Sequence, residues 1–217
     1  MGSLFKTTKS IKTIFFDIGG VVVTAPMTNY LKLGTEIFEC EPKVLNDATA
    51  RHLPGLETGL LSSEEFWEKL SGSIAESGHG KSVPSWKFKG FWEGILTDVL
   101  QVNREVVDLV RKLKAHVRVA VLSNVIKEHA VVLQREQVYE HFNPVVLSCK
   151  VGLRKPDPAI FVKAAEIAKT KPDRCMLIDD DANNIEAAKK AGFETLHFFS
   201  AEELTREIYR MGLLDNG

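Results

Sequence analysis

The strongest fold signal in the chain is the segment Ile14-Phe15-Phe16-Asp17-Ile18-Gly19-Gly20-Val21-Val22-Val23, in which an apolar run ends in one carboxylate and two glycines. A short apolar run bounded by turn residues predicts a strand that is buried on both faces, as in a parallel sheet. Open α/β sheets bind their ligands at the carboxyl ends of such strands, which makes Asp17 a candidate functional residue. The two glycines allow a sharp bend and a close approach of the backbone to a bound group.

Length and charge narrow the class of protein. The chain has 217 residues, with 28 Lys and Arg against 29 Asp and Glu. This length suits one domain with an insertion, or a domain with a small second one. The near balance of charge gives no reason to expect a nucleic acid or an anionic membrane as partner. Because no transmembrane run or signal peptide follows Met1, we expect a cytoplasmic protein, either a monomer or a homodimer.

The cysteines and histidines show no metal-binding spacing. Cys40, Cys149 and Cys175 are far apart and form no Cys-x-x-Cys pair. We expect free thiols in a reducing compartment and no zinc site. Cys175 falls within an apolar run, which predicts a place in the core.

From about residue 100 onward, strand and helix patterns alternate, which predicts βα units and a parallel sheet. The expected strands cover residues 117–122, 145–147, 175–178 and 195–199. The expected helices follow Asn103 and cover residues 126–138, 158–168, 183–191 and 202–211. The predicted fold class is therefore α/β, with helices on both faces of the sheet.

Residues 24–99 follow a different pattern, with helical periodicity and no convincing buried strand. Ser62-Ser63-Glu64-Glu65 has the form of a capping box at the start of a helix. Residues 71–85 are rich in Gly and Ser, which predicts a loop. The aromatic residues of this segment are expected to form a core of their own. We predict a small helical cap at 24–99, inserted after the first strand into a core domain made of 11–23 and 100–217.

Polar residues follow four of the predicted strands or the turns beside them. They are Asp17, the pair Ser123-Asn124, Lys155 in the run Arg154-Lys155-Pro156-Asp157-Pro158, and the pair Asp179-Asp180. The carboxyl ends of parallel strands lie at one edge of the sheet, so these side chains are expected to converge. Lys155 precedes a helix whose start is marked by prolines, which brings it to the same edge.

These residue types suit phosphoryl transfer. The carboxylate of Asp17 can attack phosphorus and form an acyl phosphate. Lys155 can offset negative charge on the nucleophile and on the phosphate. The hydroxyl of Ser123 and the amide of Asn124 can hold phosphate oxygens.

The same edge predicts a magnesium site. Asp180, together with Asp17 and a main-chain carbonyl near Gly19, offers the oxygen ligands that Mg²⁺ prefers. Asp179 and Asp180 could instead begin the following helix as solvated caps. Two carboxylates at a buried strand end repel each other unless a cation lies between them, which favours the metal.

Four segments together resemble the haloacid dehalogenase-like superfamily, in the order and at the distances usual for it. They are Phe16-Asp17-Ile18-Gly19-Gly20-Val21, Leu122-Ser123-Asn124, Gly152-Leu153-Arg154-Lys155-Pro156-Asp157-Pro158 and Ile178-Asp179-Asp180-Asp181-Ala182-Asn183-Asn184. The resemblance covers about Lys12 to Phe199. It implies a Rossmann-like sheet, Mg²⁺ and, in most members, phosphatase activity.

The resemblance also implies individual roles. By motif position, Asp17 is the nucleophile, and Asp180 is the second side-chain ligand of the metal. Asp179 would lie behind these ligands, and Asn184 would support the acidic loop.

Gly19 departs from the family pattern, because phosphatases of the family usually carry a second Asp there as general acid and base. Such catalysis contributes roughly 10²–10⁴-fold. One interpretation is a phosphatase for substrates with good leaving groups. Another is a non-catalytic module that binds a ligand or a protein. A third is dehalogenase-type hydrolysis, but the Asp179-Asp180 pair argues for a metal and against that chemistry.

The sequence therefore predicts a Mg²⁺-dependent hydrolase of small phosphomonoesters that works through an aspartyl phosphate on Asp17. Its partner would be a small phosphorylated molecule. The substrate itself is not readable, because the predicted cap offers only generic helices and aromatic residues.

Overall fold

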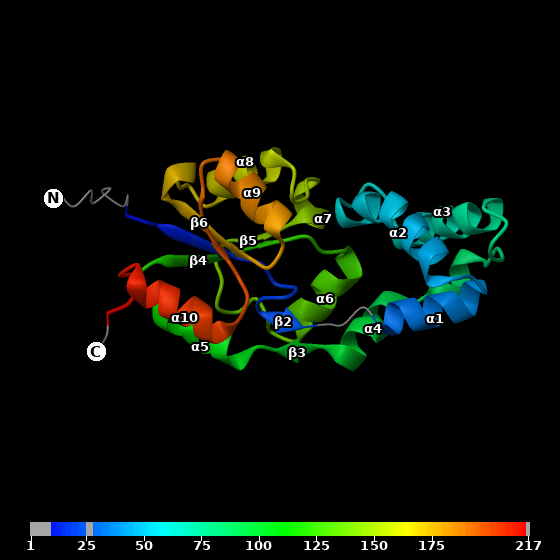
Figure 1. Cartoon of the computed structure of the whole chain (residues 1–217), viewed down its shortest axis with the longest axis horizontal. Coiled ribbons are helices and arrows are strands. Elements are labelled where there is room, and N and C mark those ends of the chain that lie inside the picture. Colours follow the sequence, from blue (N-terminus) through cyan, green and yellow to red (C-terminus); the bar gives the residue numbers. More distant parts are fainter. Residues whose placement is uncertain (1–9, 25–27, 216–217) are drawn as a thin grey trace.

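The computed structural model describes residues 10–24 and 28–215 of the chain. Its centre is a five-stranded parallel sheet with the strand order β5-β4-β1-β6-β7 (Figure 1). The strands are β1 (Thr13–Phe16), β4 (Arg118–Ser123), β5 (Val145–Leu147), β6 (Cys175–Asp179) and β7 (Glu194–His197). The predicted α/β class with a parallel, Rossmann-like sheet is confirmed.

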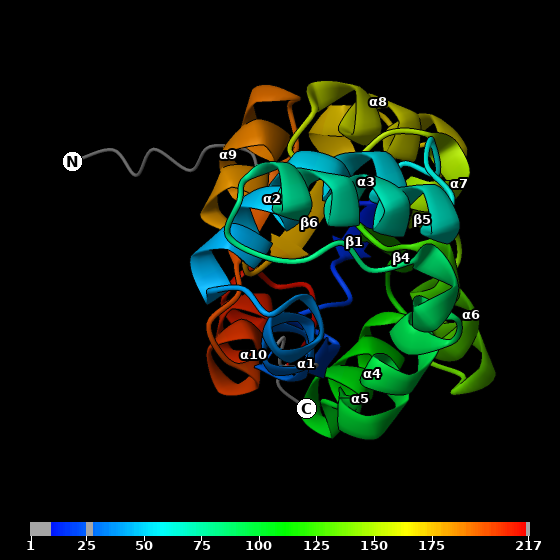
Figure 2. The same ribbon diagram turned by 90° about the vertical axis from the view of Figure 1, so that its right-hand side faces the viewer.

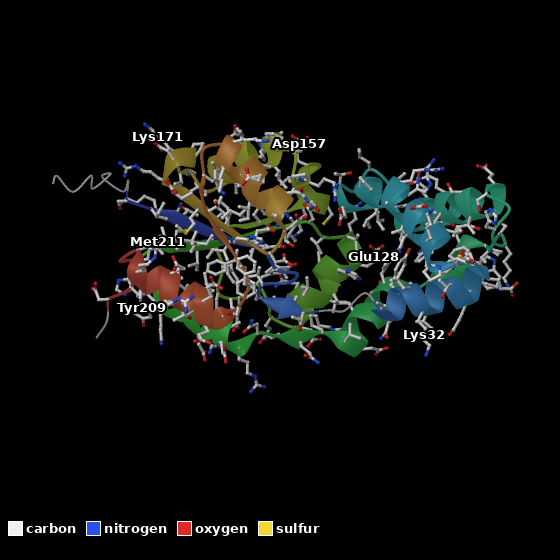
Figure 3. All side chains as sticks on the ribbon, viewed as in Figure 1. Lys32, Glu128, Asp157, Lys171, Tyr209 and Met211 are labelled. Atoms are coloured by element: carbon white, nitrogen blue, oxygen red, sulfur yellow. The ribbon has the colours of Figure 1, made fainter. Side chains whose placement is uncertain are left out.

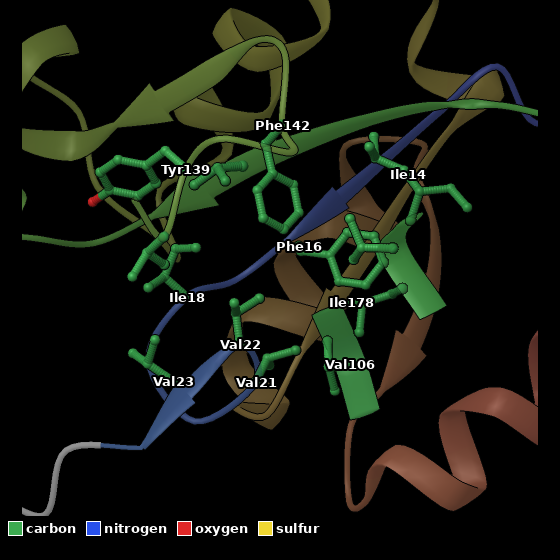
Figure 4. Close-up of a cluster of buried hydrophobic side chains, with 14 of the residues drawn as sticks. Ile14, Phe16, Ile18, Val21, Val22, Val23, Val106, Tyr139, Phe142 and Ile178 are labelled. Atoms are coloured by element: carbon green, nitrogen blue, oxygen red, sulfur yellow. The ribbon is translucent and has the colours of Figure 1, made fainter. Parts of the chain in front are cut away.

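Both faces of the sheet are covered because successive strand residues point to opposite sides. Ile14 and Phe16 of β1 belong to one buried cluster, whereas Phe15 between them belongs to another. Helices α5 (Arg104–Leu113), α6 (Lys127–Arg135) and α10 (Ala201–Arg210) contribute to the first cluster. Helices α8 (Pro158–Ile167) and α9 (Ala182–Lys190) contribute to the second. Figure 4 shows Phe16 beside Phe142 and Ile178 in the first cluster.

The register of the sheet places the end of β1 between the ends of its two neighbours. Phe16 is paired with Val121 of β4 and with Ile178 of β6. The next amide, that of Asp17, still donates to the Ile178 carbonyl at 2.9 Å. Asp17 therefore leaves the sheet at the same edge as the residues that follow β4 and β6.

Residues between the first strand and α5 form a group of helices, here called the helical insert. It consists of α1 (Thr28–Phe38), α2 (Pro42–Glu57), α3 (Ser63–Glu76), the 3-10 helix η1 (Ser85–Phe88) and α4 (Phe91–Val99). The insert extends from one end of the α/β part and faces the carboxyl ends of its strands (Figures 1 and 2). It has its own buried cluster, in which the rings of Trp67 and Phe88 stack with centroids 3.9 Å apart.

The start of α3 agrees with the predicted capping box, since Ser62 accepts from the Glu65 amide and Glu65 accepts from the Ser62 amide. The predicted loop at 71–85 is wrong in its first part, because α3 continues to Glu76. Ser71 is buried on the core-facing side of α3, where its hydroxyl accepts from the Val83 amide at 2.6 Å. Its small polar side chain is thus used for packing rather than for a turn.

Several short elements were not predicted. β2 (Val23–Thr24) and β3 (Gln101–Val102) form a two-residue antiparallel ladder where the chain enters and leaves the helical insert. α7 (Ser148–Val151) and η2 (Pro172–Arg174) span about one turn each. Helix α6 also ends earlier than expected, before Gln137 at a φ of 58°. β2, β3, α7 and η2 are each too short to show a hydrophobic period.

In the described part of the chain, no helix combines the length and apolar character needed to cross a membrane.

Candidate active site

Three carboxylates meet at the carboxyl edge of the sheet. Asp17 follows β1, while Asp179 ends β6 and Asp180 comes next in the chain. One oxygen from each lies within 4.8 Å of the others. Because β1 and β6 are neighbours in the sheet, this convergence follows directly from the strand order.

Lys155 is the cation of this cluster. Its side chain is only 1% exposed, and its Nζ lies 3.0 Å from Asp17 Oδ1 and 2.5 Å from Asp179 Oδ2. A lysine is rarely so deeply buried unless its charge is paired. The position of Lys155 between two carboxylates supplies that pairing.

Asp179 uses both of its oxygens within the protein. Oδ2 accepts from Lys155, and Oδ1 accepts from the Asp181 amide at 2.9 Å and from Asn184 Nδ2 at 3.0 Å. Asp179 and Asn184 are both buried. The geometry suits a role in holding the acidic loop, and it leaves Asp17 and Asp180 as the carboxylates that we expect to ligate a metal.

Asp180 is exposed and lies against the backbone of the first loop. An ideal Cβ atom on Gly20 would be 2.1 Å from Asp180 Oδ2, so a larger residue would displace that carboxylate, and the φ of +79° also favours glycine. On the other side, the carbonyl of Asp180 lies 2.9 Å from Nε2 of His197, at the end of β7. Asp180 is thus held between the loop after β1 and the end of β7.

The electrostatics of the cluster favour a cation. Burial raises the pKa of Asp17 to about 6, against the opposing effect of the Lys155 ammonium. Burial together with the charge of Asp179 also raises the pKa of Asp180. Burial by itself lowers the pKa of Lys155, but the adjacent Asp17 and Asp179 carboxylates raise it above its ordinary value. Three carboxylates against one ammonium leave an excess of negative charge that a divalent ion would offset.

The donor set fits Mg²⁺. The cluster contains carboxylate oxygens and no sulfur or imidazole nitrogen, and hard cations prefer oxygen. Asp17, Asp180 and the main-chain carbonyl near Gly19 would hold the ion. A Cβ atom on Gly19 would meet nothing within 4 Å, so the first loop has open space beside this position.

The pair predicted to bind phosphate has a more specific arrangement than the sequence indicated. The side chain of Asn124 donates to the Lys155 carbonyl and accepts from the Lys155 amide, both at 2.8 Å. Its amide group therefore holds the backbone of Lys155, which leaves the main-chain N–H of Asn124 as its candidate phosphate donor. Ser123 is buried at the end of β4, with its Oγ 3.5 Å from the Asn124 carbonyl.

Sequence reasoning missed Glu57, Ser148 and Glu128, which lie where the α/β part meets the helical insert. Glu57 at the end of α2 contacts both Ser148 and Arg154 of the α/β part. Figure 3 shows that Glu128, on the first turn of α6, also lies toward the helical insert. The one available signal was Gly59, since a glycine shortly after a helix often marks its end.

Comparisons with known proteins show what this chain is similar to. The sequence model of the haloacid dehalogenase-like hydrolase family matches residues 11–192. The chain is 28% identical to the D-ribitol-5-phosphate phosphatase of Bacteroides thetaiotaomicron, covering 91% of this chain and 97% of that protein.

Two solved structures are similar throughout. A predicted HAD-like family hydrolase from Porphyromonas gingivalis is 25% identical, has a TM-score of 0.75, and is matched over 95% of this chain and 100% of the other. A HAD family enzyme of Bacteroides thetaiotaomicron, in complex with magnesium and inorganic phosphate, has a TM-score of 0.69 at 22% identity over 87% of this chain and 94% of the other. The second likeness shows the shared fold.

Proposed function

Because the chain belongs to the haloacid dehalogenase-like hydrolase family and is therefore an enzyme of that class, we propose that it hydrolyses small phosphomonoesters with the help of Mg²⁺. The observation that carries this proposal is the contact between Asp17 and the buried Lys155, with Nζ and Oδ1 3.0 Å apart beside Asp180. A nucleophilic carboxylate, a fixed ammonium and a second carboxylate for the ion are the groups that phosphoryl transfer needs.

In the first step, a carboxylate oxygen of Asp17 attacks phosphorus as the bond from phosphorus to the ester oxygen breaks. The phosphoryl group is then an acyl phosphate on Asp17, and the leaving alkoxide takes a proton from water. In the second step, water attacks phosphorus, which releases orthophosphate and restores the carboxylate. Lys155 orients Asp17 and offsets charge on the phosphoryl oxygens. Bound Mg²⁺ would supply further charge stabilisation for the same oxygens.

The amide of Asn124 and the hydroxyl of Ser123 are proposed to hold phosphoryl oxygens. Ser123 is the last residue of β4 and Asn124 comes next, and β4 is the neighbour of β1, which Asp17 follows. Backbone amides at such an edge are suitable donors for a phosphate. The Asn124 side chain acts at a distance from the substrate, through the backbone of Lys155.

Gly19 shapes the substrate preference. No side chain at this position can protonate the leaving group, so the rate should depend steeply on how stable the leaving group is as an anion. Anomeric sugar phosphates and acyl phosphates are the favoured classes. Polyol phosphates belong in the same panel, because the Bacteroides relative is a D-ribitol-5-phosphate phosphatase.

The helical insert is proposed to act as a cap over this site. We propose the division into a core of 11–23 and 100–217 and a cap of 24–99. The insert has a buried cluster of its own and faces the carboxyl ends of the strands. It would exclude water during the transfer and supply the contacts that select the substrate.

The absence of an acidic side chain at Gly19 also supports a second candidate, a non-catalytic module that binds a phosphorylated ligand. The two functions are separated by measuring orthophosphate release from a panel of phosphate esters, with Mg²⁺ and with a chelator. A phosphatase releases many equivalents of orthophosphate per protein, and only with Mg²⁺. Release of one equivalent or less from every ester would support the binding module instead.

A further inference from the structure

Glu57, the last residue of α2, contacts the α/β part through two separate atoms. Its carboxylate Oε2 accepts from Arg154 Nε at 2.7 Å, and its main-chain carbonyl accepts from Ser148 Oγ at 2.7 Å. The Glu57 side chain is only 14% exposed. One residue of the helical insert therefore combines an ion pair and a hydrogen bond to two different core segments.

Ser148 extends the contact of the Glu57 carbonyl toward Val125. It is fully buried at the start of α7, and its hydroxyl accepts from the Val125 amide at 2.9 Å while donating to Glu57. A hydroxyl has one proton to donate and can accept at the same time, so this geometry uses both abilities. Val125 directly follows Asn124, so the contact ends one residue from the candidate phosphate site.

Arg154 extends the contact of the Glu57 carboxylate toward Lys155. It directly precedes Lys155, whose amide and carbonyl are both held by the Asn124 side chain at 2.8 Å. The contacts therefore form a closed ring that runs from Glu57 to Arg154, Lys155, Asn124, Val125 and Ser148 and returns to Glu57. In this ring, any displacement of Glu57 acts on the loops of Asn124 and Lys155 together.

The turn after Glu57 packs closely against α7. A Cβ atom on Gly59 would be 2.8 Å from the Cys149 carbonyl and 3.3 Å from Lys127 Cε, and the φ of Gly59 is +71°. Figure 1 shows α2 ending beside α7, where Cys149 lies. The glycine lets the end of α2 come close enough for the Glu57 contacts to form.

We propose that Glu57 is a positioning residue that couples the seating of the helical insert to the placement of Asn124 and Lys155. This inference rests on the proposed function, because it states how the phosphoryl-transfer site is assembled. When the insert is seated, the Glu57 carboxylate neutralises Arg154 and the Glu57 carbonyl fixes Ser148. Lys155 then keeps its contact with Asp17. When the insert moves away, the Arg154 charge is left half-buried beside Lys155, and both loops lose a partner.

The test is a double-mutant cycle with Glu57→Gln, Arg154→Gln and the double variant, assayed on p-nitrophenyl phosphate with Mg²⁺. Each single change is expected to lower kcat by about tenfold with little change in KM, because Lys155 acts mainly in the transition state. The kcat of the double variant is expected to be no lower than that of the less active single variant. Arg154→Lys, which keeps the charge, should retain more activity than Arg154→Gln.

Glu39→Gln is the matched control. It removes another glutamate of the helical insert, whose ion pair with Lys81 is exposed and shares no residue with the ring. This variant should keep kcat within about twofold of the parent, as expected for an exposed pair. Losses that multiply in the double variant, or an equal loss in Glu39→Gln, would overturn the proposal.

Hydrogen exchange gives a second readout that does not depend on turnover. The amides of Val125 and Lys155 are both donors in the ring. Glu57→Gln should speed their exchange about tenfold, while Glu39→Gln leaves it unchanged. If the parent protein hydrolyses no ester, the proposed function fails, and this exchange comparison alone decides the inference. Unchanged exchange at both amides in Glu57→Gln and in Arg154→Gln would overturn it.

Discussion

Gly20 lies directly against the carboxylate of Asp180, so that a Cβ atom on Gly20 would be 2.1 Å from Oδ2 and 2.4 Å from Cγ. Its neighbour Gly19 faces open space, where a Cβ atom would meet nothing within 4 Å. The two adjacent glycines of the first loop therefore differ: Gly19 has space for a side chain and Gly20 does not.

Gly20→Ala should weaken Mg²⁺ binding and turnover. The new methyl group would displace the Asp180 carboxylate, and the φ of +79° would add backbone strain of about 1 kcal/mol. We expect at least a tenfold loss of Mg²⁺ affinity by calorimetry. Gly94→Ala in α4, where a Cβ atom also meets nothing, is the control and should bind Mg²⁺ normally. Unaltered Mg²⁺ affinity in Gly20→Ala would argue against Asp180 as a ligand.

Gly19→Asp should fold normally and supply the missing acid. For esters with poor leaving groups, we expect kcat/KM to rise by up to about 10²-fold, the low end for general acid catalysis. The dependence of rate on the pKa of the leaving group should become flatter. Gly19→Asn has nearly the same shape but cannot donate a carboxyl proton, so it should keep the steep dependence. Equal slopes in the parent and in Gly19→Asp would argue against this view of position 19.

Lys155→Met should damage both stability and activity. The change removes the cation from between Asp17 and Asp179, which leaves two buried carboxylates without their partner. Breaking a buried ion pair costs about 3–5 kcal/mol in the free energy of unfolding, which urea denaturation can measure. Lys163→Gln, which removes an exposed ion pair with Glu166, should cost less than about 1 kcal/mol. Similar losses in the two variants would mean that the buried pairing contributes little.

His129 should make the fold less stable in mild acid. Burial lowers the pKa of His129 to about 4 although the Trp92 carbonyl opposes this shift. The unfolded chain, with an ordinary histidine, then binds more protons between about pH 4 and pH 6.5, so stability falls as pH falls through that window. We expect the free energy of unfolding relative to His129→Gln to drop by about 2 kcal/mol from pH 7 to pH 5. A constant difference between the two proteins would contradict the assignment of a buried neutral imidazole.

The sequence was informative about the site wherever chemistry followed a buried strand. Asp17 and Asp180 were identified as neighbours because parallel strands end at one edge, and the structure brings them together. Lys155 was placed at the same edge from the prolines that follow it. The structure adds that Lys155 is almost completely buried and pairs with both Asp17 and Asp179.

Contacts between distant loops were beyond the sequence. The amide of Asn124 was expected to hold phosphate, but nothing in the sequence indicated that the Asn124 side chain holds the backbone of Lys155, 31 positions away. Glu57 pairs with Arg154 across 97 positions and has no local pattern that distinguishes it from a solvated glutamate. Side-chain periodicity reports which face of an element is buried, and it carries no information on which distant polar group will be opposite.

The most direct test is orthophosphate release by the parent protein and by Asp17→Asn, under identical Mg²⁺ and ester concentrations. The amide keeps the size of the side chain but is a poor nucleophile, so turnover should fall by at least about 10³-fold while the protein remains folded. Adding a chelator to the parent protein should reduce orthophosphate release to a similar extent. Turnover in Asp17→Asn close to that of the parent would contradict the assignment of Asp17 as the nucleophile.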